Sequence, residues 1–376
     1  MPGILSINLS AIQHNWRYIA KQVVAGAEAG AVVKANAYGL GVQPVAQALF
    51  AAGCRTFFVA HFAEAQALKS TLASDCRIFI LTGVRESEIA ACVEANFIPV
   101  LVSAEQCRQW AAGCNRLGTQ AFSAIKVDTG MHRLGLCDDE LSTLLADEQL
   151  LLSCSPILLM SHLACAELPD HPLNRQQLNS FQKAIAQVRK KIPNIAISFA
   201  NSSGIFLGSE YHFNLVRPGV SLYGVNPTPH LANPMQAVVN LRLPVLQIKT
   251  VRGPAAVGYD ALYSIPAGEQ RRLAIVAGGY ADGLFVKLTN AGVGLLAGQE
   301  VPMVGRTSMD TTIFDISAID DAIIAGRQNH FINVLDAEHC VDQLAREADT
   351  IGYEILTSLG QRYQREYFTN EITGSD

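Results

Sequence analysis

The sequence contains few charged residues and no cluster of basic ones. Charged residues make up 16% of its 376 positions and hydrophobic residues 49%, a balance typical of a globular enzyme and not of a disordered chain. Lysine and arginine number 28 against 33 acidic residues, which gives a formal net charge of −5. This charge and the absence of a basic run argue against a surface for nucleic acids.

Long apolar runs and paired cysteines are also missing. No uninterrupted apolar stretch approaches the ~20 residues needed to span a bilayer. Residues 1–6 lack the basic region and long apolar segment of a signal peptide. The nine cysteines are scattered singly without Cys-x-x-Cys spacing, which favours reduced thiols over disulfides or a zinc site. We therefore expect a soluble, cytoplasmic protein without a metal ion, membrane partner or nucleic-acid partner.

The sequence alternates regularly between short apolar segments and amphipathic ones. A first helix is expected after Ser10, which can cap it. The apolar segments predict eight strands, at 31–34, 56–60, 77–82, 98–102, 122–127, 157–162, 195–201 and 215–219. The amphipathic segments between them predict helices that include 62–72, 86–95, 104–117 and 173–190. Eight strands alternating with helices predict an α/β fold, a closed (β/α)8 TIM-like barrel over residues 1–232.

The pattern changes from residue 233 onward. The predicted strands become longer and alternating, at 238–250, 273–278, 312–316 and 331–335, and glycine clusters replace the helices between them. A final helix is expected over 342–359. Because a chain of this length exceeds one ordinary core, residues 233–376 are predicted to form a second, mostly β domain.

Polar residues follow the ends of five predicted barrel strands. Active sites of (β/α)8 barrels lie at the carboxyl ends of the strands. The residues placed there are Lys34, Lys126, Asp128, His162, Asn201, Ser202, Arg217 and Gly219. Any one of them alone is explained by an ordinary structural role, but five converging strand ends indicate a site.

Lys34 and the segment Asn201–Gly204 together suggest a cofactor. Burial of an ammonium group lowers its pKa, and the neutral amine suits Schiff-base chemistry, although a lysine can also reach solvent from a strand end. Asn201–Gly204 follows a strand and opens a helix, where hydroxyl and backbone N–H groups can bind phosphate, although taken alone an ordinary helix cap is the better explanation. The combination suggests pyridoxal 5'-phosphate.

The residues from Val33 to Gly41 (VKANAYGLG) resemble the pyridoxal-phosphate signature of the alanine racemases, within the fold-type III amino-acid racemases. The resemblance covers nearly the whole chain. It continues at 126–135, 161–164, 200–202, 217–224, 257–259, 279–283, 305–310 and 351–354. It implies racemisation of L-alanine to D-alanine, which supplies peptidoglycan precursors or interconverts alanine in catabolism.

The resemblance also implies two bases and an unusual partner for the cofactor ring. Lys34 would hold the cofactor and act as one base at the substrate Cα, while Tyr259 of the second subunit in a homodimer would act from the opposite face. Tyrosine is a weak base at its ordinary pKa of ~10, so a cationic field from His162 and Arg217 would be needed. Arg217 would bond the pyridine nitrogen, which has to stay unprotonated because a guanidinium only donates.

Further matching residues receive binding roles through the resemblance. Those that match the cofactor pocket and its surroundings are Tyr38, His162, Asn201, Ser202, Arg217, Gly219, Val220 and Tyr353. Arg133 and the backbone of Met309 match contacts to the substrate carboxylate, which an arginine fork suits. Tyr280 and Asp310 belong to supporting motifs, and Lys126 matches a lysine that is carbamylated in many relatives. An unmodified Lys126 beside Arg133 would be a like-charge pair.

Two departures from the family and three other functions remain open. Asp260 stands where relatives commonly have glycine, and Ser308 where some have cysteine. The alternative functions are a racemase for serine or longer amino acids, a non-catalytic pyridoxal-phosphate carrier, and a decarboxylase on the same plan. A carrier would not need Tyr259. In a decarboxylase the pyridine nitrogen would be expected to meet a carboxylate instead of Arg217.

Overall fold

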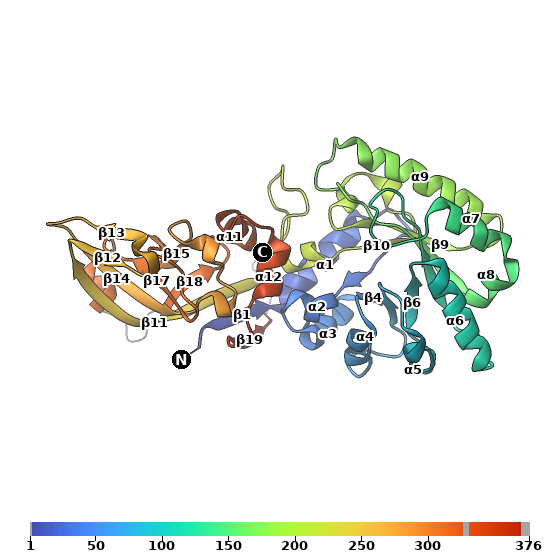
Figure 1. Ribbon diagram of the computed structural model, residues 1–376, viewed down its shortest axis with the longest axis horizontal. Coiled ribbons are helices and arrows are strands. Elements are labelled where there is room, and N and C mark those ends of the chain that lie inside the picture. Colours follow the sequence, from blue (N-terminus) through green and yellow to red (C-terminus); the bar gives the residue numbers. More distant parts are fainter. Residues whose placement is uncertain (1, 326–330, 370–376) are drawn as a thin grey trace, which may run out of the picture. The chain divides into compact units, whose positions relative to one another are not determined.

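The computed structural model describes residues 2–325 and 331–369, which form two compact units (Figure 1). One unit, the barrel unit, consists of Ile12–Leu222 and Asn226–Met235. The other, the strand-rich unit, consists of the described residues of Met1–Ala11, Tyr223–Val225 and Gln236–Asp376. The predicted domain boundary between residues 232 and 233 falls close to Gln236, whereas residues up to Ala11 group with the strand-rich unit. The predicted domain ends at residues 1 and 376 lie outside the described residues.

The barrel unit contains one all-parallel sheet that closes on itself (Figure 1). Its strands are β2 (Glu28–Ala29), β3 (Ala31–Val32), β4 (Thr56–Val59), β5 (Arg77–Ile80), β6 (Ile98–Leu101), β7 (Ser123–Lys126), β8 (Pro156–Met160), β9 (Ala196–Asn201) and β10 (Leu215–Arg217). Only Gly30 separates β2 from β3, and β2 pairs with β10 while β3 pairs with β4. The two pieces therefore act as one bent strand that closes the barrel, and the predicted (β/α)8 fold is confirmed.

Helices cover the outside of this sheet (Figure 1). They are α1 (Leu9–Gln22), α3 (Val42–Ala52), α4 (Phe62–Lys69), α5 (Ile89–Glu94), α6 (Ala104–Arg116), α7 (Asp138–Ala146), α8 (Glu148–Cys154) and α9 (Pro172–Arg189), with short 3-10 turns η1 (Glu86–Glu88), η2 (Gly204–Phe206), η3 (Ser209–Tyr211) and η4 (Val220–Tyr223). The short segment α2 (Lys34–Tyr38) differs from these helices, because the residues inside it have left-handed backbone angles. Every residue of β4, β6 and β7 is buried, as expected for parallel strands covered on both faces. The predicted cap Ser10 is wrong: α1 begins one residue earlier, and the Asn8 side chain accepts from the Ala11 amide at 3.0 Å.

The strand-rich unit is built around the long strand β11 (Val239–Arg252) (Figure 1). Its other strands are β1 (Ile4–Asn8), β12 (Ala255–Val257), β13 (Tyr263–Ile265), β14 (Gln270–Ala277), β15 (Val293–Leu296), β16 (Gln299–Pro302), β17 (Thr311–Asp315), β18 (Phe331–Leu335) and β19 (Gln364–Phe368). Strand β11 pairs antiparallel with β1, β14 and β18, and β1 also pairs parallel with β19. These pairings explain why the first residues of the chain group with the last ones.

Two helices stand where one was predicted over 342–359. They are α11 (Val341–Glu347) and α12 (Gly352–Ser358), and the unit also contains α10 (Asp321–Ala325), η5 (Tyr259–Ala261), η6 (Tyr280–Asp282) and η7 (Val286–Leu288). The break between α11 and α12 contains Asp349 at a φ of 52°, a left-handed conformation that ends a right-handed helix.

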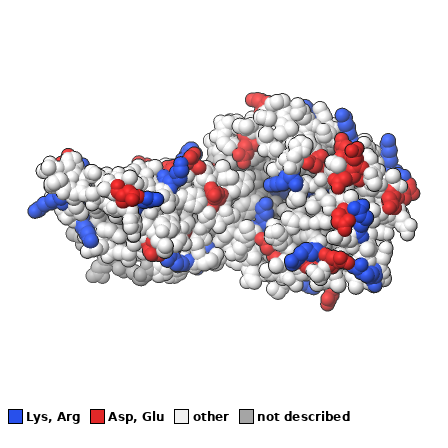
Figure 2. All heavy atoms as spheres, viewed as in Figure 1, with Lys and Arg blue, Asp and Glu red and all other residues white. Residues whose placement is uncertain are grey.

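Charges of both signs are interspersed over the visible face of the barrel unit (Figure 2). No helix among the described residues combines the length and the apolar character needed to cross a bilayer.

Candidate active site

The carboxyl ends of the barrel strands bring four cationic or titratable side chains together. Lys34 follows β3, Lys126 ends β7, His162 follows β8 and Arg217 ends β10. Burial, together with the charges of Arg217 and Arg133, lowers the pKa of Lys126 to about 8. Burial and then the charge of Arg133 lower the pKa of Lys34, although Glu64 opposes them. Both amines are therefore neutral more often than an exposed lysine at the same pH, and the neutral form is the one that reacts with carbonyl groups.

Lys34 begins an unusual turn that differs from the predicted strand end. Strand β3 stops at Val32, and the residues from Ala35 to Tyr38 all adopt left-handed backbone angles, with φ between 52° and 55°. Such angles cost roughly 1–2 kcal/mol per residue for side chains other than glycine. The Gly39 amide bonds the Ala35 carbonyl at 2.8 Å, and the Gly41 amide bonds that of Asn36 at 2.9 Å. The turn buries the Tyr38 side chain, and this burial raises the pKa of Tyr38.

Arg217 is buried and held by partners on β9 and directly after β8. Its guanidinium donates to the Ser198 hydroxyl at 2.6 Å, to the Ser161 carbonyl at 2.7 Å and to the Phe199 carbonyl at 3.2 Å. Burial lowers the pKa of Arg217 to about 9, so it stays protonated at neutral pH.

The ring of His162 is neutral beside this guanidinium, so the expectation that His162 contributes to a cationic field is wrong. Arg217 Nη2 lies 3.2 Å from His162 Nδ1, and because a guanidinium only donates, Nδ1 has to accept. Burial, followed by the charges of Arg217 and Lys126, holds the pKa of His162 well below its ordinary value. The proton of the neutral ring is therefore on Nε2.

Ser202 is the centre of a buried group of donors, named here the Ser202 cluster: Tyr38, Ser202, Gly219, Val220 and Ser221. The Ser202 hydroxyl oxygen accepts from the Gly219 amide at 2.8 Å and contacts the Ser221 hydroxyl at 3.0 Å. Val220 is the first residue of η4, so its amide lies outside the hydrogen bonds of that helix. A Cβ atom on Gly219 would lie 2.5 Å from the Tyr38 hydroxyl oxygen, so only glycine permits this approach.

Asn201 has the ordinary role that the sequence left open. Its side-chain oxygen accepts from the amide of Gly204, the first residue of η2, at 2.9 Å. This bond turns the chain after β9 and directs the next residue, Ser202, into the Ser202 cluster.

Asp128 organises the loop that carries Arg133, a role that the sequence did not reveal. One of its carboxylate oxygens accepts from the amides of Gly130, Met131 and His132 at 2.9, 3.0 and 3.1 Å. Burial raises the pKa of Asp128, but these three bonds outweigh burial and lower it overall. Arg133, exposed at the end of this loop, acts electrostatically on Lys34, Lys126 and His162.

The strand-rich unit carries the other predicted site residues on linked loops. Tyr259, Met309 and Tyr280 are exposed by 68%, 53% and 45% of their surface, which is unusual for large apolar side chains. The Tyr280 amide bonds the Ser308 carbonyl at 3.0 Å, and the Ala281 amide bonds the Met309 carbonyl at 3.0 Å. These bonds hold the loops of Tyr280 and Met309 against each other.

Asp310 contributes to the same arrangement through an arginine that the sequence did not single out. Arg362 pairs with Asp310 at 2.7 Å and with both carboxylate oxygens of Asp282 at 2.6 Å. Asp282 accepts in turn from the Gly279 amide at 3.0 Å. Tyr353 lies half-buried on α12. The last residue of this helix, Ser358, lies next to Gly283, the glycine that follows η6: a Cβ atom on Gly283 would lie 2.3 Å from the Ser358 carbonyl oxygen.

The departure at Asp260 is accommodated by its backbone. Asp260 has a φ of 60°, the left-handed region that favours the glycine of relatives but that aspartate also tolerates. Its carboxylate pairs with Arg306, so the extra negative charge next to Tyr259 has a cationic partner.

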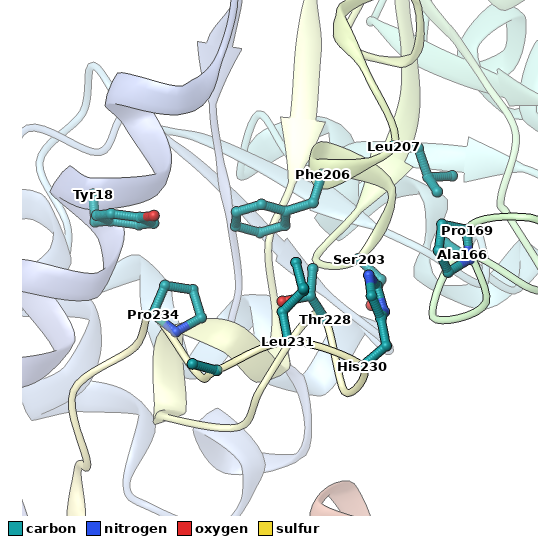
Figure 3. Close-up of a pocket in the computed structure, with 11 residues that line it drawn as sticks. Tyr18, Ala166, Pro169, Ser203, Phe206, Leu207, Thr228, His230, Leu231 and Pro234 are labelled. Atoms are coloured by element: carbon teal, nitrogen blue, oxygen red, sulfur yellow. The ribbon is translucent and has the colours of Figure 1, made fainter.

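A cavity of about 300 Å³ opens among loops of the barrel unit, apart from the four clustered side chains (Figure 3). Tyr18 and Pro234 line one end, and Ala166 and Pro169 line the other (Figure 3). The described residues that line it include no lysine, arginine, aspartate or glutamate. We therefore place the candidate site at the four strand ends.

Comparisons with known proteins show the family to which the chain is similar. Residues 7–227 match the family model described as alanine racemase, N-terminal domain, and residues 238–367 match alanine racemase, C-terminal domain. The chain is 46% identical to an alanine racemase of Rhodospirillum rubrum, over 97% of this chain and 96% of that protein. It is 44% identical to a catabolic alanine racemase of Agrobacterium fabrum, over 97% and 92%.

A solved structure has the same fold over its full length. The alanine racemase of Bartonella henselae, described with covalently bound pyridoxal phosphate, matches with a TM-score of 0.91 at 37% identity. The match covers 98% of this chain and all of that chain.

Proposed function

Since the chain belongs to the alanine racemase family of isomerases, we propose that it interconverts L- and D-alanine with pyridoxal 5'-phosphate, using Lys34 and Tyr259 as opposite bases. The observation that carries the proposal is the convergence of a lysine of lowered pKa, a buried arginine and the Ser202 cluster in one unit.

The Ser202 cluster fits the phosphate of this cofactor. It combines the Ser202 and Tyr38 hydroxyl groups with the Val220 amide at the first turn of η4, where an anion is favoured. The glycine at 219 keeps the backbone and the Tyr38 hydroxyl close together. Lys34 would hold the cofactor covalently, and the lowered pKa of its amine suits that bond.

Arg217 and His162 would control the electronics of the cofactor ring. When bound, pyridoxal 5'-phosphate supplies an electron sink that makes the substrate Cα–H bond acidic. Arg217 would donate to the ring nitrogen and leave it unprotonated, because a guanidinium cannot supply a mobile proton. Its bonds to Ser198 and to the carbonyls of Ser161 and Phe199 fix the direction of that donor. Arg217 would therefore hold the ring nitrogen without protonating it, which would limit how strongly the ring withdraws electrons and would disfavour transamination.

Lys34 and Tyr259 would exchange the proton at the substrate Cα. One base takes the proton and the electron pair stays with Cα; the other base then delivers a proton to the opposite face, and the new Cα–H bond inverts the configuration. The exposure of Tyr259 supports a role in a site completed by a second subunit.

Arg133 and the Met309 backbone would bind the substrate carboxylate. Arginine pairs with a carboxylate through two parallel hydrogen bonds, and the Asp128 loop orders the segment before Arg133. Lys126 has a substantial neutral fraction because its pKa is about 8. The neutral amine can add CO2 and lose a proton to give a carbamate, which would turn a like charge near Arg133 into an opposite one.

Hydrogen exchange at Cα in D2O tests the two-base assignment. We expect the purified protein with pyridoxal 5'-phosphate to convert L-alanine into Cα-deuterated D-alanine, as read by chiral chromatography with mass spectrometry. Lys34→Ala should abolish exchange, and Tyr259→Phe should slow inversion about 10²- to 10⁴-fold while exchange of one enantiomer persists. Lys69→Ala, which removes an exposed lysine at the end of α4, is the matched control.

Other outcomes would exclude the proposal in distinct ways. Exchange without inversion in the unmodified protein would remove Tyr259 from its role. Hydrogen exchange at Cα of serine but not of alanine would show that serine, and not alanine, is the substrate. Cofactor binding with no exchange of any amino acid would indicate a carrier.

A further inference from the structure

The left-handed turn after Lys34 is anchored by a side chain from a neighbouring helix. Glu64, in the first turn of α4, accepts from the Ala35 amide through Oε1 at 2.6 Å. Its other oxygen, Oε2, accepts from the amides of Ala60 and His61 at 2.6 and 3.1 Å. One carboxylate therefore joins the segments that follow β3 and β4, two strands that are paired in the barrel.

This arrangement goes beyond ordinary helix capping. Glu140 has the same position in α7, third in the helix, and accepts from the amide of its own N-cap residue, Cys137, at 3.1 Å. Glu64 makes the equivalent contact to His61 through Oε2. Oε1 is then directed to Ala35, 29 positions earlier in the sequence. The second contact fixes the first residue of the turn, directly after Lys34.

The charge of Glu64 also reaches Lys34. Burial and the charge of Arg133 lower the pKa of Lys34, and Glu64 is the anion that opposes them. Hydrogen bonds from amides to a carboxylate are stronger than neutral ones, so the same group can hold the backbone and act on the amine.

We propose that Glu64 is a positioning residue for Lys34: its carboxylate clamps the Ala35 amide to the end of β4 and so fixes where the Lys34 side chain starts. This role rests on the proposed function of Lys34 in holding the cofactor. Glu64 does not need to touch cofactor or substrate, because it acts through the backbone of the turn.

The test compares Glu64→Gln with Glu140→Gln. In the full-length protein freed of cofactor, the pH midpoint of Lys34 acetylation by acetic anhydride is measured by mass spectrometry, with Lys69 as internal reference. We expect Glu64→Gln to move that midpoint to lower pH, because the anion that raises the Lys34 pKa is gone. The dissociation constant for pyridoxal 5'-phosphate should rise about 10- to 100-fold, the range expected for loss of one charge-assisted hydrogen bond. Glu140→Gln should change neither value.

A second variant keeps the proposal testable if Glu64→Gln does not fold. Glu64→Asp keeps the negative charge at the start of α4 but is one methylene too short to serve both strand ends. Its thermal midpoint should stay near that of the unmodified protein while its cofactor affinity falls. Unmodified affinity in Glu64→Asp, or an unmoved Lys34 midpoint in a folded Glu64→Gln, would overturn the proposal. Because acetylation is measured without cofactor or substrate, its result is independent of whether the protein is a racemase.

Discussion

Gly219 and Tyr38 compete for the same space at the scale of single residues. A Cβ atom at position 219 would lie 2.5 Å from the Tyr38 hydroxyl oxygen and 3.4 Å from Val32 Cβ. Both Tyr38 and Val32 are buried, so neither can swing away into solvent. The hydroxyl of Tyr38, and not its ring, makes the closest contact.

Gly219→Ala is expected to destabilise the protein through this contact. Overpacking of a dense interior costs about 1–3 kcal/mol, so the midpoint of thermal unfolding should fall by several degrees. Adding Tyr38→Phe removes the clashing oxygen, and the double variant should recover part of the loss. Measuring Tyr38→Phe alone as well completes a double-mutant cycle, in which the coupling between the two changes can be calculated. Strictly additive effects of the two changes would show that the hydroxyl is not the obstacle.

Sequence reasoning identified residues whose side chains do chemistry and missed those that act through the backbone. Lys34, His162 and Arg217 were predicted because charged groups at strand ends need an explanation. Glu64 looks like an ordinary acidic residue in the sequence, and Asp128 was placed at a strand end without a specific role. The role of each is visible only once the amides that it accepts from are known. No pattern of residue types encodes which distant amide a carboxylate meets.

At the scale of elements, a buried histidine links α11 to β18. His339 Nδ1 lies 2.7 Å from the Val334 carbonyl oxygen, and Nε2 lies 2.7 Å from Glu347 Oε1. A ring protonated on both nitrogens satisfies both contacts, because each nitrogen then donates to an oxygen atom. Burial lowers the pKa of His339, but the bond to Glu347 and then the bond to Val334 outweigh it and raise the pKa overall.

The strand-rich unit should therefore lose stability as the pH rises. A histidine whose folded pKa lies above its unfolded pKa contributes its full stabilisation below ~6.5 and loses it as the pH passes through the folded pKa. Thermal midpoints at about pH 6 and about pH 8 should differ more for the unmodified protein than for His339→Gln. The difference should correspond to roughly 1–3 kcal/mol, the range for a hydrogen bond to a charged group. An equal pH dependence in both proteins would contradict the doubly protonated ring.

Helices and strands were predicted correctly where the local pattern of apolar residues determines them. They were missed where pairing with a distant strand determines them. The parallel strands are buried on both faces, so each reads as an apolar run with clear ends. Strand β1 escaped prediction because its alternation is short and its partners, β11 and β19, lie far along the chain. The interruption between α11 and α12 escaped it because Asp349 gives no sequence signal for a left-handed angle.

At the scale of the whole molecule, the two units carry different parts of the proposed chemistry. Lys34 and Arg217 belong to the barrel unit, whereas Tyr259 and Met309 belong to the strand-rich unit. The family resemblance implies that the active site combines the barrel unit of one subunit with the strand-rich unit of another. This expectation leads to a quantitative test with two inactive variants.

Mixing Lys34→Ala with Tyr259→Phe should restore activity if the sites are shared between subunits of a homodimer. Random exchange makes half of the dimers mixed, and each mixed dimer has one intact site of two, so about a quarter of the unmodified activity is expected. Native mass spectrometry checks that mixed dimers have formed. Mixed dimers without activity would place both bases of each site in the same chain.

The pairing of β1 with β19 has a consequence for how the protein is made. Residues 4–8 are synthesised long before Gln364–Phe368, one of their two neighbouring strands. At about 5–20 residues per second, the first strand waits roughly tens of seconds for that neighbour. The barrel unit between them is synthesised in the meantime. Until β19 is made, the edge of β1 that faces it has no strand to pair with, and an unpaired strand edge can pair with another chain.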